Sequence, residues 1–324
     1  MAAGDKVTNA MDTYTSKASG KGGLREDLSD IIYNISPTDT PFMSMIGRRN
    51  VTNTLFEWQI DSLAAAATNY QLEGEELSRA ASTASTRATA MCQISFKDAT
   101  VTGTQRSVSH AGTNDMLAYQ MTKRSKELKR DIEKMALDNN AAVTGDATTA
   151  RETGGLPAWL TSNVSRGGGS PAGASGSSGT TAATDAATTR ALSESLVETV
   201  AQSIYTNGGE AGVISVGPFN KTKVSDFTGR TNSRHMVDEN AVANNVTVYD
   251  SDFGNFKVVI NRFQREKDCW LIDPEYARLA FLRNFQVTEI AKVGDSDTRM
   301  ILAEWGLQVD NEAAHGVVAD LTTS

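Results

Sequence analysis

The residues of this chain that could carry out chemistry are few and lie far apart. His110, His235 and His315 occur singly, and none stands in a ligand pattern such as His-Glu-x-x-His. Cys92 and Cys269 have neither the spacing of a metal site nor that of a redox pair, which is typical of a reduced cytosolic protein. The sequence therefore predicts no metal ligands, no cofactor site and no catalytic residues.

Phosphate-binding loops and acid–base pairs are not indicated either. No Gly-x-x-x-x-Gly-Lys-Ser/Thr motif occurs, and the glycines at 167–169 are followed by further small residues. Glu73, Glu75 and Glu76 cluster on a glycine-bearing segment, where nothing predicts the pocket that a general acid or base needs. A hydrolase or transferase of unfamiliar type would need a pocket lined by buried carboxylates, and the sequence offers none.

Composition indicates a globular protein. The 324 residues are 39% hydrophobic and 22% charged, enough for a sizeable core divided between two lobes. The formal net charge of -8 argues against a broad DNA-binding face, because phosphate contacts require clustered lysine and arginine. No stretch approaches the roughly 20 apolar residues of a membrane span, and residues 1–24 lack the apolar centre of a signal peptide.

An N-terminal arm is expected over residues 1–48. Its first 24 residues are small, polar and glycine-bearing, and the apolar segment LREDLSDIIYNISPTDTPFMSMIG follows them. This segment combines a short helical stripe with Pro37 and Pro41, which force extended backbone. So short an apolar segment needs a surface to lie against, either another subunit or the long helix of its own chain. The side chains expected in that contact are Ile31, Ile32, Ile35 and Phe42.

Residues 49–104 predict an extended hairpin, because alternating runs at 51–62 and 91–104 read as two strands. The second run places three side chains on one side: Cys92, Ile94 and Phe96. The middle, 63–90, has too few large apolar groups to form a core, and loops of this length are usually functional or mobile. We expect the hairpin to leave the body and to contact another subunit through Glu73, Glu75, Glu76 and Arg79.

The clearest helix is expected at 114–140, with Thr113 or Asn114 as its cap and a length of about 40 Å. Its apolar positions recur at threes and fours: Leu117, Met121, Leu128, Ile132 and Met135. The opposite face mixes bases and acids: Lys123, Arg124, Lys126, Glu127, Lys129, Arg130, Asp131 and Glu133. Such neighbours mostly pair locally. This face is therefore either a solvated surface or a contact with a neighbouring subunit.

The remaining chain mixes helices and strands, so the fold class is α+β. Residues 161–184 are nearly all Ser, Thr, Gly and Ala, typical of a flexible surface segment. An amphipathic helix follows at 186–206, and a second helix starts at Pro218. Strands are expected at 212–217, 246–249, 256–260, 268–273, 285–291, 299–309 and 315–321. The unusual features are all extensions, and extensions that cannot bury themselves imply assembly.

The arm, the strand with Phe56-Glu57-Trp58, the segment Leu72-Glu73-Gly74 and the C-terminal block from Asp295 to His315 together resemble major capsid proteins of tailed bacteriophages. The Ser-Pro-x-x-Thr-Pro-Phe element and the C-terminal block are the most specific parts. The resemblance implies the capsid fold shared by tailed phages and the herpesvirus shell floor. Its parts would be the arm (1–48), the extended loop hairpin (49–104), a peripheral domain on a long spine helix (105–184), an axial domain (185–290) and C-terminal strands that complete the body (291–324).

The resemblance also implies a function. Many copies would form hexamers and pentamers that close into an icosahedral shell around double-stranded DNA, enclosed without specific recognition. Partners would be a separate scaffolding protein, a portal and a decoration protein, with no membrane. The product would be a virion capsid assembled in the host cell cytoplasm. The alternative is an encapsulin-like cellular compartment with the same fold.

Overall fold

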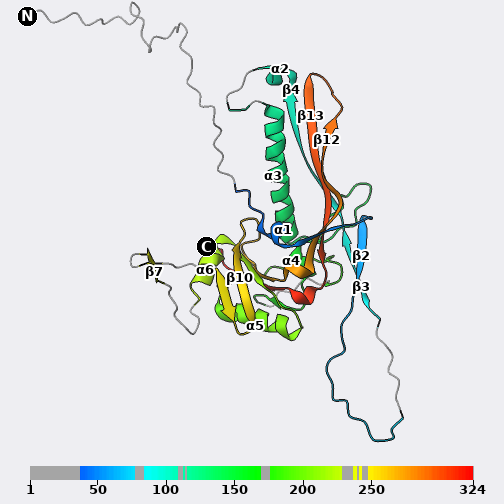
Figure 1. Ribbon diagram of the computed structural model, residues 1–324, viewed down its shortest axis with the longest axis vertical. Coiled ribbons are helices and arrows are strands. Elements are labelled where there is room, and N and C mark those ends of the chain that lie inside the picture. Colours follow the sequence, from blue (N-terminus) through cyan, green and yellow to red (C-terminus); the bar gives the residue numbers. More distant parts are fainter. Residues whose placement is uncertain are drawn as a thin grey trace, which may run out of the picture.

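The computed structural model describes residues 37–76, 84–108, 112–113, 115–168, 176–227, 236–238, 241–242 and 247–323 (Figure 1). Ile31, Ile32, Ile35 and Arg79, four of the expected contact residues, lie outside these ranges. None of the helices in the described ranges is long and apolar enough to cross a membrane.

A four-stranded sheet and one long helix form the first lobe. The strand order is β1 (Gly47–Asn50), β12 (Ala277–Ile290), β13 (Ser296–Val309) and β4 (Gln93–Thr102). Only β1 runs parallel to its neighbour; the other pairs are antiparallel. The expected alternation in 299–309 is confirmed, since its apolar face is buried: Ile301, Ala303, Trp305, Leu307 and Val309.

Helix α3 (Met116–Leu137) lies along this sheet (Figure 1). It is the expected long helix, and four of the five stripe residues are buried: Leu117, Met121, Leu128 and Ile132. Met135 is half-buried against the same core. The expected cap is wrong: Asp115 caps the helix by accepting hydrogen bonds from the backbone N–H groups of Leu117 and Ala118. A carboxylate next to the first turn serves better than Thr113, because it also interacts favourably with the helix dipole.

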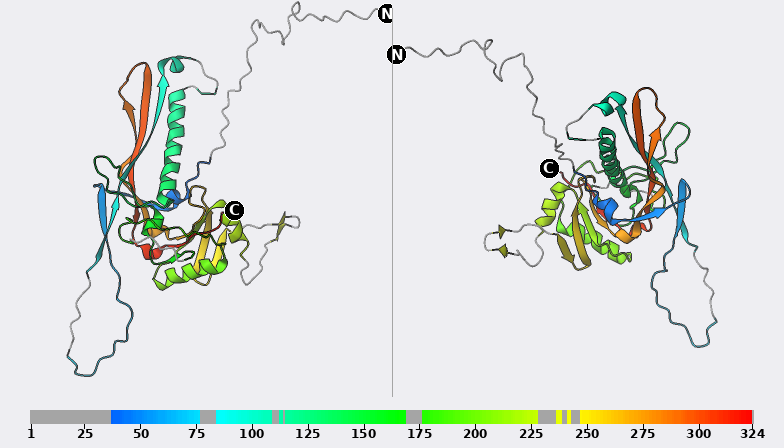
Figure 2. Two further views of the ribbon diagram at one scale, coloured as in Figure 1. Left: turned by 180° about the vertical axis from the view of Figure 1, so that it is seen from behind. Right: turned by 45° about the horizontal axis from the view of Figure 1, so that its top comes forward.

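The extended hairpin is present, but its second strand differs from the prediction. Strand β2 (Leu55–Ile60) pairs with β3 (Thr86–Met91), whereas β4 pairs with β13. The alternating run at 91–104 therefore belongs to the first sheet. Cys92, between β3 and β4, is buried, while Ile94 and Phe96 are 46% and 58% exposed, so the three do not share one environment. Figure 2 shows the loop residues that follow β2, 61–76, projecting from the body in two further views.

A six-stranded sheet forms the second lobe. Its order is β5 (Val164–Ser165), β14 (Gly316–Val318), β11 (Cys269–Ile272), β6 (Val213–Val216), β10 (Gly254–Ile260) and β9 (Val248–Ser251). Helix α5 (Glu194–Thr206) packs its apolar face on this sheet in a core of its own. The short elements are α1 (Pro41–Met45), α2 (Gly103–Ser107), α4 (Leu156–Trp159), α6 (Pro218–Ser225), β7 (Met236–Asp238), β8 (Ala241–Val242), η1 (Pro274–Tyr276) and η2 (Glu312–Ala314).

The two lobes interleave along the chain. Residues 277–290, expected in the axial segment, form β12 and pair in the first sheet; the separate strand expected at 285–291 is the far half of β12. Conversely, β5 and β14 come from outside 185–290 and join the second sheet. The lobe to which a strand belongs depends on the strand it pairs with, and that partner can lie far away in the sequence. A domain boundary at residue 290 therefore does not separate the two lobes.

Candidate assembly site

The loop that follows β2 leaves the body and is uncovered along its described part. Every residue from 61 to 76 is exposed. Three large apolar side chains stand in solvent, with exposed fractions of 98%, 85% and 78%: Leu63, Tyr70 and Leu72. Three large apolar side chains left in solvent on one loop make this loop a candidate site of protein contact.

A turn at 72–75 organises the acidic part of this loop. Gly74 has a φ of +83°, which favours glycine, and the Glu75 N–H donates to the carbonyl of Leu72 at 3.1 Å. The Leu72 N–H donates in return to the Glu75 carboxylate at 3.0 Å. Glu73 and Glu76 have no ion-pair partner within the described ranges. The loop therefore presents two carboxylates without an ion-pair partner among the described residues, beside its apolar side chains.

Strands β2 and β3 fix the base of the loop to the body. Phe56 is buried, and the Trp58 ring lies 5.7 Å from the ring of Trp159. The Trp58 indole N–H donates to the carbonyl of Asp310 at 3.1 Å. These contacts end at Ile60, so the loop leaves a rigid base and is uncovered beyond it.

Glu133 joins the N-terminal arm to the long helix. Helix α1 starts at Pro41 and has no capping side chain of its own. Instead, the Glu133 carboxylate accepts the N–H groups of Phe42 and Met43, each at 2.7 Å, and so serves as the cap from a distant helix. The Asn261 side-chain amide, just after β10, donates to the same carboxylate at 2.7 Å. Burial raises the pKa of Glu133, and these hydrogen bonds oppose the rise. One carboxylate thus fixes the arm, the long helix and the second lobe together.

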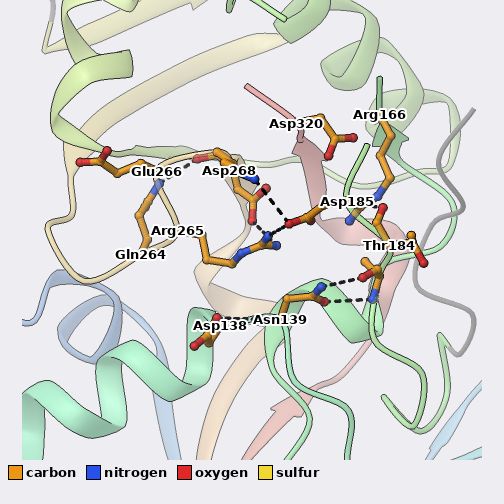
Figure 3. A network of polar contacts seen from close by, with 12 residues as sticks. Asp138, Asn139, Arg166, Thr184, Asp185, Gln264, Arg265, Glu266, Asp268 and Asp320 are labelled. Carbon is orange, nitrogen blue, oxygen red and sulfur yellow. Dashed lines mark hydrogen bonds and ion pairs between the residues drawn. The ribbon is translucent and has the colours of Figure 1, made fainter. Parts of the chain in front are cut away.

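A second polar joint lies at the end of α3 (Figure 3). Arg265 forms ion pairs with Asp185 and with Asp268, the latter at 3.2 Å. Asp268 is buried; desolvation raises its pKa to about 6, although the Arg265 charge opposes the rise. Asn139 pairs its side-chain amide with both backbone groups of Ala183, at 2.6 and 2.9 Å. This joint attaches the segment around 183–185 to α3 and to the second lobe.

A third buried charged residue, Glu304, and a hollow lie at the first sheet, on the side where Ile94 is exposed. Glu304 is buried and pairs with Arg151 and Arg283, each at 2.7 Å. Beside Arg151 lies a hollow of about 330 Å³, lined also by Ile94 and Asp146. Among the residues that the structure describes, no group of three or more His, Cys, Asp or Glu could hold a metal ion. The ion pairs here hold structural elements together, and the geometry points to contact surfaces.

The profile of the SU10 major capsid protein family matches residues 6–322. The chain belongs to this family. It is 27% identical over 334 residues to the major capsid protein of Escherichia phage Phieco32, covering 92% of this chain and 94% of that one. The solved capsid of the native GTA particle superposes with a TM-score of 0.65 at 13% identity, over 96% of this chain and 100% of the other. The capsid asymmetric unit of cyanophage A-1(L) gives 0.62 at 12% identity, over 93% and 98%.

These similarities confirm the expected α+β capsid fold of tailed phages, and they do not favour the encapsulin-like alternative. The family is one of structural capsid proteins rather than an enzyme class. A member of a capsid family functions as part of a shell, so its functional residues are those that meet neighbouring copies.

The structure brings only part of the expected contact set onto one surface. Glu73, Glu75 and Glu76 lie exposed on the loop of this capsid protein, and their contact with another subunit stays a prediction. Phe42 has 0% exposure and belongs to the same core as α3, so it packs on its own chain, the second of the two surfaces considered for the arm. Leu63, Tyr70 and Leu72 were not singled out. The sequence does contain a signal for them, because they are the large apolar residues of a segment that otherwise consists of small and polar residues.

Glu133 was assigned to the charged face of the long helix, which was expected to be either solvated or in contact with a neighbouring subunit; this assignment is wrong, because Glu133 is buried within its own chain. It follows Ile132 and stands at the edge of the apolar stripe, which is a weak signal for burial. Nothing in the sequence of residues 40–43 shows that the arm lacks a cap of its own. Only the fold brings the two segments together.

Proposed function

We propose that this chain assembles into hexamers and pentamers that close into an icosahedral shell, and that this shell encloses the double-stranded DNA of a tailed phage. The single observation that carries the proposal is the uncovered loop, with its three exposed apolar side chains on a rigid base. Ordering such a loop costs conformational entropy, and burial of its apolar side chains against a neighbour offsets that cost. Membership of a capsid family supplies the kind of neighbour, another copy of the chain.

In this proposal each lobe forms one domain of the capsid subunit. Residues 1–48 act as the arm and 49–104 contain the extended loop; α3 and the first sheet form the peripheral domain, and the second sheet forms the axial domain at the capsomer centre. The C-terminal strands complete both. A separate scaffolding protein, a portal and a decoration protein are the proposed partners, assembly takes place in the host cell cytoplasm, and the mature product is the virion.

The loop provides the test of this proposal. Because Ile60 is the last residue of β2 to pair, with Thr86, residues 61–85 can be replaced by a two-residue Asn-Gly turn that preserves the β2–β3 pairing. We expect the variant to stay folded, with an unchanged midpoint of chemical unfolding, and to form at least tenfold fewer shells by sedimentation and negative-stain microscopy. A second variant combines Leu63→Ser, Tyr70→Ser and Leu72→Ser, keeps the loop length and should also assemble poorly.

Tyr205→Ser is the matched control. Tyr205 is 65% exposed on α5, far from the loop in sequence, so its replacement should leave the yield of shells unchanged. Shells in normal yield from the Asn-Gly variant would contradict the proposed role of the loop. Particles from the unmodified chain that never contain DNA, even from infected cells, would contradict the phage function.

A further inference from the structure

The surface of α3 that faces away from the core carries a row of cations. Lys123, Lys126, Arg130 and Lys134 are spaced by three, four and four residues, so they share one side of the helix. The three lysines are exposed. From Lys123 to Lys134 the row spans about 16 Å at a rise of 1.5 Å per residue.

The acids of the same helix do not neutralise this row, contrary to the sequence-based expectation of local pairing. Glu127 does pair locally, with Arg124 at 2.7 Å. Asp131, however, binds Lys97 on β4 at 2.7 Å, and Glu133 is turned inward to the arm. Within the described part of the chain, no carboxylate lies within 4.0 Å of the three lysine ammonium groups.

Arg130 is held in place rather than neutralised. Its guanidinium lies over the Phe263 ring, 5.1 Å from the ring centre, which keeps the charge while fixing its position. The opposite side of this lobe, formed by the first sheet, is apolar rather than charged in this region. There β4 exposes Ile94 and Phe96, whose exposed fractions are 46% and 58%. One broad face of this lobe is thus partly apolar, and the other carries cations that have no carboxylate partner among the described residues.

We propose that the cationic row of α3, defined by Lys123, Lys126, Arg130 and Lys134, lines the inner wall of the shell and contacts the phosphate backbone of the enclosed duplex. This inference rests on the proposed function. Four cations in a row are suited to bind a polyanion. Lysine side chains are flexible and can donate to phosphate oxygens in any register, so the contact does not depend on the base sequence. The apolar side of the layer suits protein neighbours and would then face away from the DNA.

The contact is weak in one copy and strong in an array. Four phosphate contacts give a slope of log K against log salt of about -3.6, and the net charge of -8 opposes binding by the rest of the chain. Unassembled subunits are therefore expected to show negligible binding to duplex DNA at physiological ionic strength. In a closed shell the rows of many copies act on one molecule, and their contributions combine.

Lysine acylation of intact particles tests the proposal. DNA-filled particles from infected cells and DNA-free shells assembled from the chain are treated with a small amine-acylating reagent, and modification is read by mass spectrometry. We expect Lys123, Lys126 and Lys134 to be modified at least fivefold less in filled particles than in empty shells. Lys257, an exposed lysine on the second sheet, is the control and should react equally in both.

Each other result has a definite meaning. Equal reactivity of the three lysines in both particles overturns the proposal, and equal protection in both also overturns it, because an acidic segment of another copy, such as the Glu73–Glu76 loop, would then cover the row. Failure of the chain to form particles would instead defeat the proposed function.

A charge-removing variant gives an independent measurement. Lys123→Gln, Lys126→Gln and Lys134→Gln together should leave folding intact, because all three side chains are exposed. Binding of a short fluorescent duplex by subunits is measured over a series of low salt concentrations starting at about 20 mM, and the slope of log K against log salt should fall in magnitude by about 3. The control, Lys223→Gln with Lys257→Gln and Lys267→Gln, removes the same charge elsewhere and should leave the slope unchanged. Equal slopes for the two variants would overturn the proposal.

Discussion

Replacing Glu133 by alanine is expected to lower the free energy of unfolding of the subunit by about 3 kcal/mol or more. The substitution leaves three donors without an acceptor: the N–H groups of Phe42 and Met43 and the side-chain amide of Asn261. A buried donor left unsatisfied costs about 1–3 kcal/mol, and the lower value for each of the three gives about 3 kcal/mol. Urea unfolding of unassembled subunits, followed by tryptophan fluorescence, measures the change.

Two companion variants separate this role from a general loss of charge. Glu127→Ala removes a carboxylate from the same helix, but its pairing with Arg124 is at the surface, so it should cost less than about 1 kcal/mol. Glu133→Gln keeps one acceptor oxygen and should fall between the two. Loss of the cap should also loosen α1, seen as faster tryptic cleavage after the exposed Arg48 and Arg49. Equal stabilities for the two alanine variants would refute the cap.

The elements that the sequence predicts well are those whose signal is local. The stripe of α3 needs only 3.6-residue periodicity, and the sequence predicts its four buried members and both helix ends to within three residues. The alternation of 299–309 was likewise enough to identify the buried face of β13. In both cases one face of a single element meets a large core, so no distant partner has to be known.

Pairing between distant segments is where prediction from sequence stops. Residues 86–104 alternate almost without interruption, yet β3 pairs with β2 and β4 pairs with β13, about 200 positions further on. Alternation assigns side chains to faces but does not choose the neighbouring strand. Glu133 shows the same limit for a polar side chain, because its partner is also distant in the sequence. Its neighbours along the helix place it among charges, and only the docked arm turns it into a buried acceptor.

The pH dependence of stability should depend strongly on His315, which lies in the C-terminal block. The ring is fully buried, and both nitrogens are occupied: Nδ1 accepts from the Asp273 N–H at 3.2 Å, and Nε2 lies 3.3 Å from the carbonyl of Tyr276, to which it donates. Protonation would place a second N–H against the Asp273 N–H. Burial of the ring lowers the pKa of His315 to about 4. The hydrogen bond to the Tyr276 carbonyl and the negative charges of Asp310 and Glu312 oppose this shift.

The sign follows from comparing the two states. Unfolded histidine has a pKa of about 6.5, so acid stabilises the unfolded chain before it can protonate the folded one. The stability that neutral His315 provides is complete above pH 6.5 and is lost as the pH falls toward 4, by about 2 kcal/mol at pH 5. Asp268 acts in the opposite direction, because its folded pKa of about 6 lies above the unfolded value, so its contribution grows as the pH falls through 6. The two effects partly cancel in the unmodified protein.

Variants can separate the two contributions that the unmodified profile conceals. His315→Gln should destabilise the subunit at pH 7.5, since glutamine cannot reproduce both ring hydrogen bonds, and this cost should shrink by about 2 kcal/mol at pH 5 because the titrating group is gone. Asp268→Asn should show the reverse trend, costing more at pH 5 than at pH 7.5 relative to the unmodified chain. Urea unfolding at both pH values measures all four differences. A cost of His315→Gln that stays constant between the two pH values would show that the ring is freely hydrated in the folded protein, and a cost that grows toward pH 5 would show that the folded ring is already protonated.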